Sequence, residues 1–178
     1  MNLNMNPQEK AVQLHEMATS CLEKNELEKA LTLYQDCFQI MEQIDDEPGK
    51  AFVLHQMASI HLQRGEVDES LSMYKDSLQI TEKIGDLKGL AITSGILAKL
   101  LVVEKEDYTA AWPLIKKAVS IFAHLKLPEL EKTQADAMYI LTGKIKQSLD
   151  EKQFTTFEEM LKNGKDALSW AKEQGVEI

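Results

Sequence analysis

The chain repeats itself with a period of 40 residues. When residues 11–50 are laid over residues 51–90, sixteen positions carry the same amino acid without a gap. The identical pairs are Ala11/Ala51, Leu14/Leu54, His15/His55, Met17/Met57, Ala18/Ala58, Leu22/Leu62, Glu26/Glu66, Leu31/Leu71, Tyr34/Tyr74, Asp36/Asp76, Gln39/Gln79, Ile40/Ile80, Glu42/Glu82, Ile44/Ile84, Asp46/Asp86 and Gly49/Gly89. A period of this size is typical of stacked repeats, in which no unit buries its apolar face alone. The pattern therefore favours an interaction surface over an active site.

The charge of the chain is acidic and unevenly distributed. Its 178 residues have a net charge of −9, which disfavours nucleic acid and anionic membranes as partners because phosphate binding needs clustered Lys and Arg. Residues 1–90 carry 16 acidic and 8 basic residues, whereas residues 91–178 carry 13 and 12. Two interpretations remain open: an acidic half that steers a basic ligand, or a solvated surface that keeps the array soluble.

Cysteine content and hydropathy indicate the compartment. Cys21 and Cys37 are too few for a disulfide scaffold and lack metal-ligand spacing. No apolar run reaches the length of a membrane span. We therefore expect a reduced, cytoplasmic protein without membrane contact.

Helical spacing of apolar residues predicts an all-α chain of eight helices in four antiparallel pairs. Asn6 is the expected N-cap of the first helix, and Asn25 and Gly65 are expected in left-handed turns. Pro113 should kink its helix, and one last helix should hold Phe154 to Ala171. The expected layout is a flexible segment 1–6, a single domain 7–175 with repeats 7–46, 47–86, 87–127 and 128–174, and a tail 176–178.

Small and large residues recur in fixed columns along the repeats. Leu14, Met17, Ala18 and Cys21 fill these columns in the first helix, and Leu54, Met57, Ala58 and His61 fill them one period later. This pattern resembles the tetratricopeptide repeat, in a longer 40-residue variant. The resemblance implies a right-handed α-solenoid that binds a protein partner on the concave face lined by the first helix of each unit.

The resemblance also implies which positions face this groove. Positions 2, 5, 6 and 9 of each unit read Val12, His15, Glu16, Thr19, then Phe52, His55, Gln56, Ser59, then Ile92, Gly95, Ile96, Lys99, then Lys132, Ala135, Asp136, Tyr139. From these, the predicted partner-binding residues are Val12, His15, Thr19, Phe52, His55, Gln56, Ser59, Ile92, Ile96, Lys99 and Tyr139. Chaperone-binding members hold a terminal carboxylate with Lys, Asn and Arg, and the matching positions here lack those residues.

Two features of the groove leave alternatives open. Residues 90–103 are apolar nearly all round the predicted helix. This segment is either a buried central helix or the lining of a groove that an apolar peptide fills. His15 and His55 lie one period apart. Three interpretations remain open for them: metal ligands, polar groove contacts or incidental features of the repeat. Because a third ligand is missing, we expect no metal and no cofactor.

No motif for catalysis occurs in the sequence, neither a Gly-rich phosphate loop nor H-E-x-x-H. The predicted function is a non-enzymatic protein-interaction module, a scaffold or regulator that binds a peptide or helix. The alternative is a self-assembling structural protein that oligomerises through its groove or C-terminal surface. There Trp170 is expected opposite Phe154 on the last helix, in a homodimer or partner contact with Val176 and Ile178.

Overall fold

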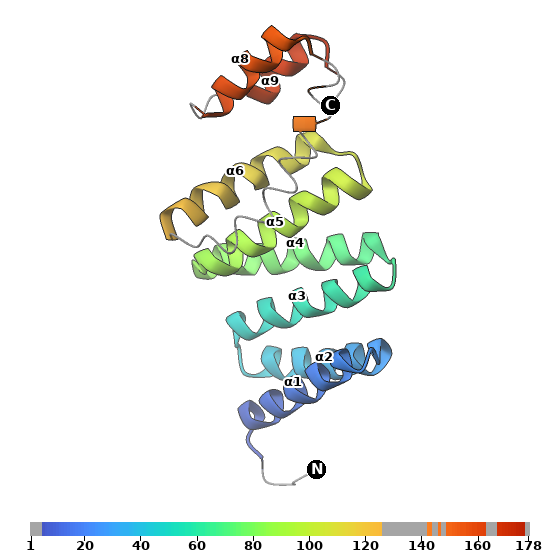
Figure 1. Ribbon diagram of the computed structural model, residues 1–178. Helices are drawn as coiled ribbons and strands as arrows, with labels where there is room; N and C mark the ends of the chain where they lie inside the picture. Colours follow the sequence, from blue (N-terminus) through green and yellow to red (C-terminus); the bar gives the residue numbers. More distant parts are fainter. Residues whose placement is uncertain (1–4, 126–141, 144–145, 147–148, 163–166, 177–178) are drawn as a thin grey trace. The chain divides into compact units, whose positions relative to one another are not determined.

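The protein is all-α in the part of the chain that the structure describes. The computed structural model describes residues 5–125, 142–143, 146, 149–162 and 167–176, and these contain helices and turns but no strand (Figure 1). The chain forms two compact units, Met1–Thr93 and Ser94–Ile178, and the division falls within helix α5 (Leu87–Glu104). The prediction of an all-α, repeat-built fold is confirmed.

The first unit contains two helix pairs that correspond to the first two predicted repeats. Its helices are α1 (Pro7–Glu23), α2 (Leu27–Gln43), α3 (Glu47–Gln63) and α4 (Val67–Ile84). Each packs against the next along the chain. The first helix begins as predicted, because the Asn6 side chain accepts from the Glu9 backbone N at 2.8 Å and the Glu9 carboxylate accepts from the Asn6 N at 3.0 Å. This reciprocal cap satisfies two amide groups that the helix cannot pair internally.

Small residues allow the helices of the first unit to approach one another. Ala11, Ala18 and Ala30 are fully buried, and the larger side chains of the core fill the space around them. From α3, the side chains of Val53, Met57 and Ile60 join this core. The core of the first unit is Ala11, Leu14, Ala18, Ala30, Leu31, Tyr34, Cys37, Ile40, Val53, Met57 and Ile60.

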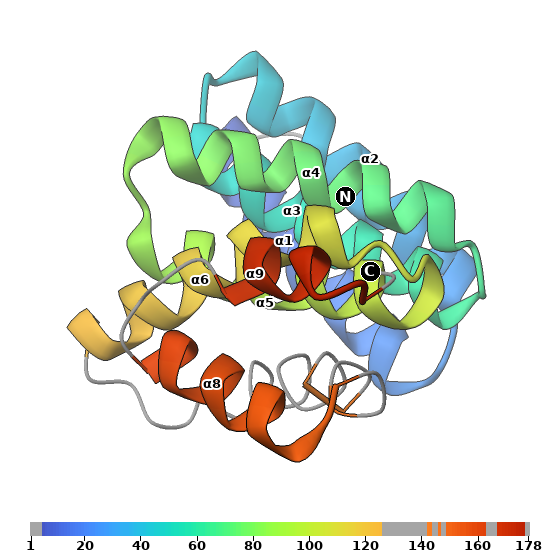
Figure 2. The same ribbon diagram turned by 90° about the horizontal axis from the view of Figure 1, so that it is seen from above.

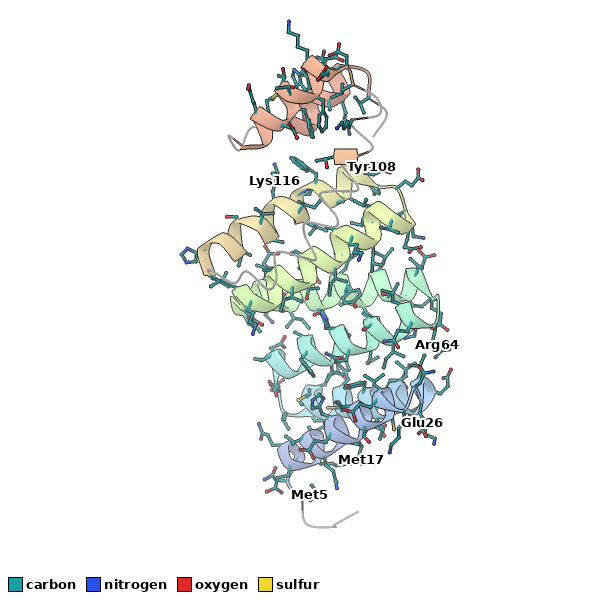
Figure 3. All side chains as sticks on the ribbon, in the orientation of Figure 1. Met5, Met17, Glu26, Arg64, Tyr108 and Lys116 are labelled. Atoms are coloured by element: carbon teal, nitrogen blue, oxygen red, sulfur yellow. The ribbon has the colours of Figure 1, made fainter. Side chains whose placement is uncertain are left out.

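The same columns have a different environment on α1, which has no earlier helix to pack against in the first unit. Gln13 and Ser20 replace the buried Val53 and Ile60 of α3. Met17 matches Met57 but is 44% exposed instead of 6%, on the surface of α1 (Figure 3). The outer face of α1 is therefore mainly polar, as is usual at the end of a repeat array.

Each helix of the first unit ends in a residue with left-handed backbone, as predicted for the turns. Asn25 and Asp45 have φ of 57° and 54°, and the equivalent Gly65 and Gly85 have φ of 78° and 72°. After each turn, a backbone N–H reaches back five residues to a helical carbonyl. These bonds join Glu26 N to Cys21 O, Asp46 N to Met41 O, Glu66 N to His61 O and Asp86 N to Thr81 O, at 2.8–3.0 Å.

An aspartate and a glycine, identical in both repeats, start the helix that follows each pair. Asp46 accepts from the Gly49 backbone N, and Asp86 accepts from the Gly89 backbone N, both at 3.0 Å. A Cβ at Gly49 would lie 2.6 Å from the Asp46 carboxylate, and a Cβ at Gly89 would collide with the Asp86 carboxylate in the same way. Glycine is therefore required because the capping carboxylate folds over this position.

The second unit contains most of α5 and helix α6 (Tyr108–Leu125). Residues 90–103 are mostly buried, since only Val103 in this stretch is largely exposed, and this burial favours the central-helix alternative. Helix α6 continues through Pro113 and buries Tyr108, Ala111, Trp112, Ile115 and Ala118. Residues 128–141, where the first helix of the fourth repeat is predicted, lie outside the described residues.

The prediction of one long last helix is wrong. The structure has two helices, α8 (Glu151–Lys162) and α9 (Ala167–Glu173), which pack against each other (Figure 2). Gln153 Nε2 donates to Gln174 Oε1 at 3.3 Å, whereas a continuous helix would separate these residues by about 30 Å. The chain therefore reverses direction, and the expected placement of Trp170 opposite Phe154 loses its basis. Val176 is buried rather than part of an exposed contact surface.

Candidate functional site

The predicted groove positions of the first unit lie on α1, α3 and the start of α5. Val12 and Phe52 are exposed by 54% and 47%, which is unusual for large apolar side chains at neighbouring positions. The other predicted residues of this unit are half-buried: His15, Thr19, His55, Gln56, Ser59 and Ile92. The first unit thus presents a mixed apolar and polar surface along these helices.

In each repeat, the groove histidine packs against the tyrosine of the second helix. The ring centroids of His15 and Tyr34 are 6.0 Å apart, and those of His55 and Tyr74 are 5.0 Å apart. Thr19 Oγ1 lies 3.4 Å from the Tyr34 hydroxyl. We call each set of histidine and tyrosine a His–Tyr pair. These pairs tie the first helix of a repeat to the second, so the histidines have a structural role beside any contact with a partner.

The two histidines differ in what they contact in the next repeat. His15 packs edge-on against Phe52, with ring centroids 5.1 Å apart. His55 instead lies 3.2 Å from Thr93, measured between Nδ1 and Oγ1. The structure therefore brings His15 and Phe52 together in one contact and places His55 at the start of α5.

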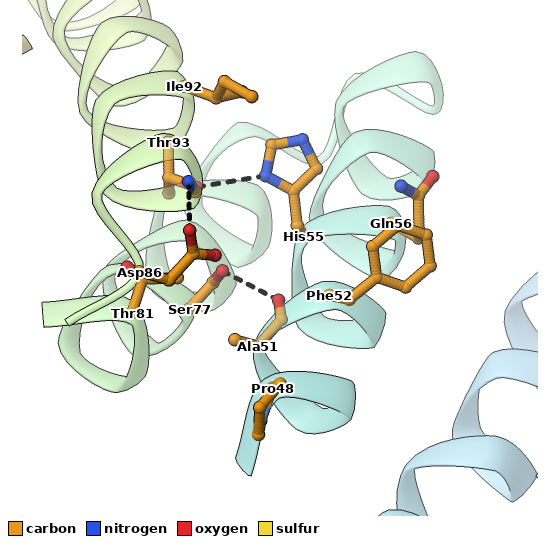
Figure 4. A pocket seen from close by; sticks show the side chains of 11 residues that line it. Pro48, Ala51, Phe52, His55, Gln56, Ser77, Thr81, Asp86, Ile92 and Thr93 are labelled. Atoms are coloured by element: carbon orange, nitrogen blue, oxygen red, sulfur yellow. Dashed lines mark hydrogen bonds between the residues drawn. The ribbon is translucent and has the colours of Figure 1, made fainter. Parts of the chain in front are cut away.

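A pocket opens beside His55, between α3, the end of α4 and the start of α5 (Figure 4). Its volume is about 240 Å³. Four of the predicted groove residues, Phe52, His55, Gln56 and Ile92, line it. The complete lining is Pro48, Ala51, Phe52, His55, Gln56, Ser77, Thr81, Asp86, Gly89, Ile92 and Thr93.

The repeat explains why space is left at this place. Thr81 occupies the column of Met41, and Ile92 occupies the column of Phe52, so the junction of the second and third repeats carries smaller side chains than the junction of the first and second. At the first of these columns, Met41 reaches the glycine of the following repeat: its Sδ lies 2.5 Å from where a Cβ of Gly49 would be. The shorter Thr81 and Ile92 leave that volume unfilled.

Burial favours the neutral forms of His55 in the pocket lining and of Tyr74, which packs against it. Burial lowers the pKa of His55, because the surrounding protein solvates an imidazolium poorly. Burial likewise raises the pKa of the Tyr74 phenol, although a hydrogen bond with Ser59 opposes this shift. The one carboxylate in the lining, Asp86, caps α5 through Gly89. No lysine or arginine lines the pocket.

Sequence reasoning missed the part of the pocket contributed by Ser77, Thr81, Asp86 and Gly89. Their signal was present in the repeat, because Asp86 and Gly89 belong to the identical columns and Thr81 is much smaller than Met41. The predicted groove covers only the first helix of each unit, whereas this wall comes from the second helix and from the N-cap of the next helix.

The remaining predicted residues lie in the second unit or outside the described part. Ile96 and Lys99 lie on α5 and Trp170 lies on α9, and each is half-buried. Tyr139 lies outside the described residues. Among those that the structure describes, His, Cys, Asp and Glu form no group of three or more arranged to hold a metal ion. Within the same residues, none of the helices combines the length and apolarity needed to cross a membrane.

Comparison with known proteins gives the family. Residues 10–83, which cover most of α1 to α4, match the family profile described as tetratricopeptide repeat. None of the curated proteins compared with the chain matches it. The matched segment includes the His–Tyr pairs and most of the pocket wall contributed by α3 and α4. Tetratricopeptide repeats generally serve as protein-interaction modules, and residues 10–83 of this chain match that family.

Proposed function

We propose that the protein is a non-enzymatic scaffold or regulator that binds a peptide or helix of a partner along α1, α3 and the start of α5. The observation that carries this proposal is Phe52, a large aromatic side chain 47% exposed at the rim of an apolar-walled pocket. Aromatic residues of this kind are frequent anchors of protein interfaces, since they bury much area at little entropic cost.

The chemistry of the pocket supports binding more than catalysis. His55 already interacts with Thr93 and packs on Tyr74, and Asp86 is engaged as a helix cap. A general acid–base mechanism needs titratable groups directed at a substrate with pKa values suited to proton transfer. The groups here serve the fold instead.

The test is a replacement that leaves the fold intact and changes the groove. Phe52→Asp should abolish partner capture, because it removes the aromatic side chain and places a strongly hydrated carboxylate where apolar area would be buried. The matched control is Val119→Asp on α6, which introduces the same group at an apolar residue that is 44% exposed. Quantitative mass spectrometry of proteins captured by both variants from cells that make this protein provides the readout.

Loss of specific partners with Phe52→Asp and their retention with Val119→Asp is the expected result. Circular dichroism should show unchanged helicity and melting temperature for both. A large loss of stability with Phe52→Asp would mean that this position belongs to the core, and equal capture by both variants would mean that partners bind elsewhere.

The second candidate function is self-assembly through the groove or the C-terminal surface. It is favoured by the exposed apolar side chains of the groove and by Trp170, which keeps part of its surface accessible on α9. Sedimentation of the purified chain over a wide range of concentrations distinguishes the two. A dimer that Trp170→Ala or Phe52→Asp weakens supports self-assembly, and a monomer at all concentrations excludes it. We place the protein in the cytoplasm under both candidates.

A further inference from the structure

We propose that the pocket beside His55 receives one apolar side chain from a basic segment of the partner. This inference rests on the proposed function and specifies the chemistry of the partner. Three properties of the pocket lead to it: its size, the pairing of its polar atoms and the charge of the surrounding surface.

The size of the pocket matches one side chain. Sites for cofactors and drug-sized molecules are about 300–1,000 Å³. At about 240 Å³, this pocket is below that range. Its open wall is formed by Phe52 and Ile92, with Pro48 and Ala51 completing the apolar lining. A Leu, Ile, Met or Phe side chain inserted here would contact carbon atoms on several sides.

Several polar side chains of the pocket already have a hydrogen-bond partner within the protein. Ser77 Oγ donates to the Ala51 carbonyl at 2.8 Å, and Thr81 Oγ1 donates to the Leu78 carbonyl at 2.9 Å. The Asp86 carboxylate accepts from Gly89, and His55 interacts with Thr93 (Figure 4). A polar ligand group buried beside these paired groups would exchange its hydration for few hydrogen bonds, and each group left unpaired would cost about 1–3 kcal/mol. The inserted group is therefore apolar.

The first unit, to which the pocket belongs, carries a net negative charge. Residues 1–90 hold 16 acidic and 8 basic residues, and the groove positions of α1 and α3 include Glu16 but no Lys or Arg. Asp86 in the pocket lining adds a second acidic residue to Glu16. Like charges across an interface are unfavourable, whereas complementary charges speed association and select partners. The residues that flank the apolar anchor are therefore basic.

The experiment selects ligands without assuming a partner. Random short peptides displayed on phage are panned against the immobilised full chain, and enriched peptides are measured by fluorescence polarisation. We expect net positive peptides with one large apolar residue whose replacement by Ala weakens binding at least about tenfold. Their affinity should also fall as NaCl rises from about 50 to about 500 mM, because salt screens the charges.

Two variants fill the pocket with the residues that stand 40 positions earlier in the same columns. Thr81→Met introduces the equivalent of Met41, and Ile92→Phe introduces the equivalent of Phe52. Each should weaken the selected peptides at least about tenfold, the loss expected when an anchor side chain is excluded. Thr155→Met on α8 is the control, since it makes the same replacement at an exposed threonine outside the first unit. Melting temperatures identify any variant that fails to fold. If one of the two pocket-filling variants fails, the other one provides the binding measurement.

The outcomes separate this inference from the function on which it rests. Acidic or neutral peptides that lose binding to Phe52→Asp would overturn the inference and leave the groove function in place. Basic peptides that bind both pocket-filling variants as tightly as the original chain would also overturn it. Failure to enrich any peptide over an unrelated helical protein would count against the proposed function itself.

Discussion

The first two repeats have nearly the same sequence pattern, yet α1 and α3 are used differently. Met17 and Met57 occupy the same column, but Met57 is packed against α2 while Met17 is exposed. Around Met57 the column partners are Val53 and Ile60, and α1 has Gln13 and Ser20 in their place. Identity at one position therefore does not determine burial. The neighbouring helix determines it, and the flanking residues are adapted to its presence or absence.

A second difference between the repeats concerns the side chains at the columns of Met41 and Phe52. The junction of the first two repeats carries Met41 and Phe52, and the junction of the second and third carries the smaller Thr81 and Ile92 and contains the pocket. The capping aspartate and glycine are the same in both. The repeat thus keeps its architecture constant while the volume of two side chains changes.

The most sensitive test of the comparison is to truncate the two matched methionines. Met57→Ala should lower the free energy of unfolding by about 2–4 kcal/mol, because it removes buried methylenes and leaves a cavity. Met17→Ala should change it by no more than about 0.5 kcal/mol, as expected for an exposed residue. Urea unfolding monitored by circular dichroism measures both. Equal losses would show that α1 is packed against something at its outer face.

The left-handed turns give a smaller contrast between the repeats. Gly65→Ala should cost about 1 kcal/mol, since a Cβ is disfavoured at its φ of 78°. Asn25→Gly, at the equivalent position of the first repeat, should instead be neutral or stabilise by up to about 0.5 kcal/mol. Thermal unfolding of the two single variants provides the measurement. A stabilising Gly65→Ala would contradict the assigned backbone conformation.

The smallest expected effect is a pH dependence that originates at His55. Burial holds the pKa of its imidazole below the value of about 6.5 in the unfolded chain, so the unfolded state takes up a proton first as pH falls. His55 therefore lowers the stability progressively below about pH 6.5, until the pH reaches its folded pKa. His55→Gln should flatten this part of the profile.

The control for this profile is His15→Gln, the same replacement one repeat earlier. Chemical unfolding at several pH values between about 5 and 7.5 covers the range in which a histidine changes charge. If His55→Gln leaves the slope unchanged, the ring is not the group whose titration is coupled to folding.

Much of the first unit was predictable because its signals are local. The cap at Asn6, the turns at Asn25 and Gly65, and the helix spacing all depend on residues close together in sequence. The last helix was predicted wrongly, because apolar spacing from Phe154 to Ala171 does not reveal a chain reversal that side-chain packing stabilises. A single sequence contains no such long-range information.

The candidate site was predicted only in part, for a similar reason. The groove positions predicted on α1 and α3 came from the family resemblance, and two of them, Phe52 and His55, line the pocket. The wall formed by Ser77, Thr81, Asp86 and Gly89 depends on how the end of α4 packs against the start of α5. This packing depends on the size of the side chain at position 81. Helical periodicity does not reveal that size, because both Met and Thr fit a helical pattern.

The polar outer face of α1 has a consequence for chain growth. A solenoid that offered Val and Ile at both ends would present complementary surfaces, and successive molecules would stack end to end into open filaments. Gln13 and Ser20 occupy the columns where Val53 and Ile60 bind the preceding helix. An incoming molecule would have to desolvate an amide and a hydroxyl there without gaining apolar contact. Polymerisation at this end is therefore discouraged by two side chains.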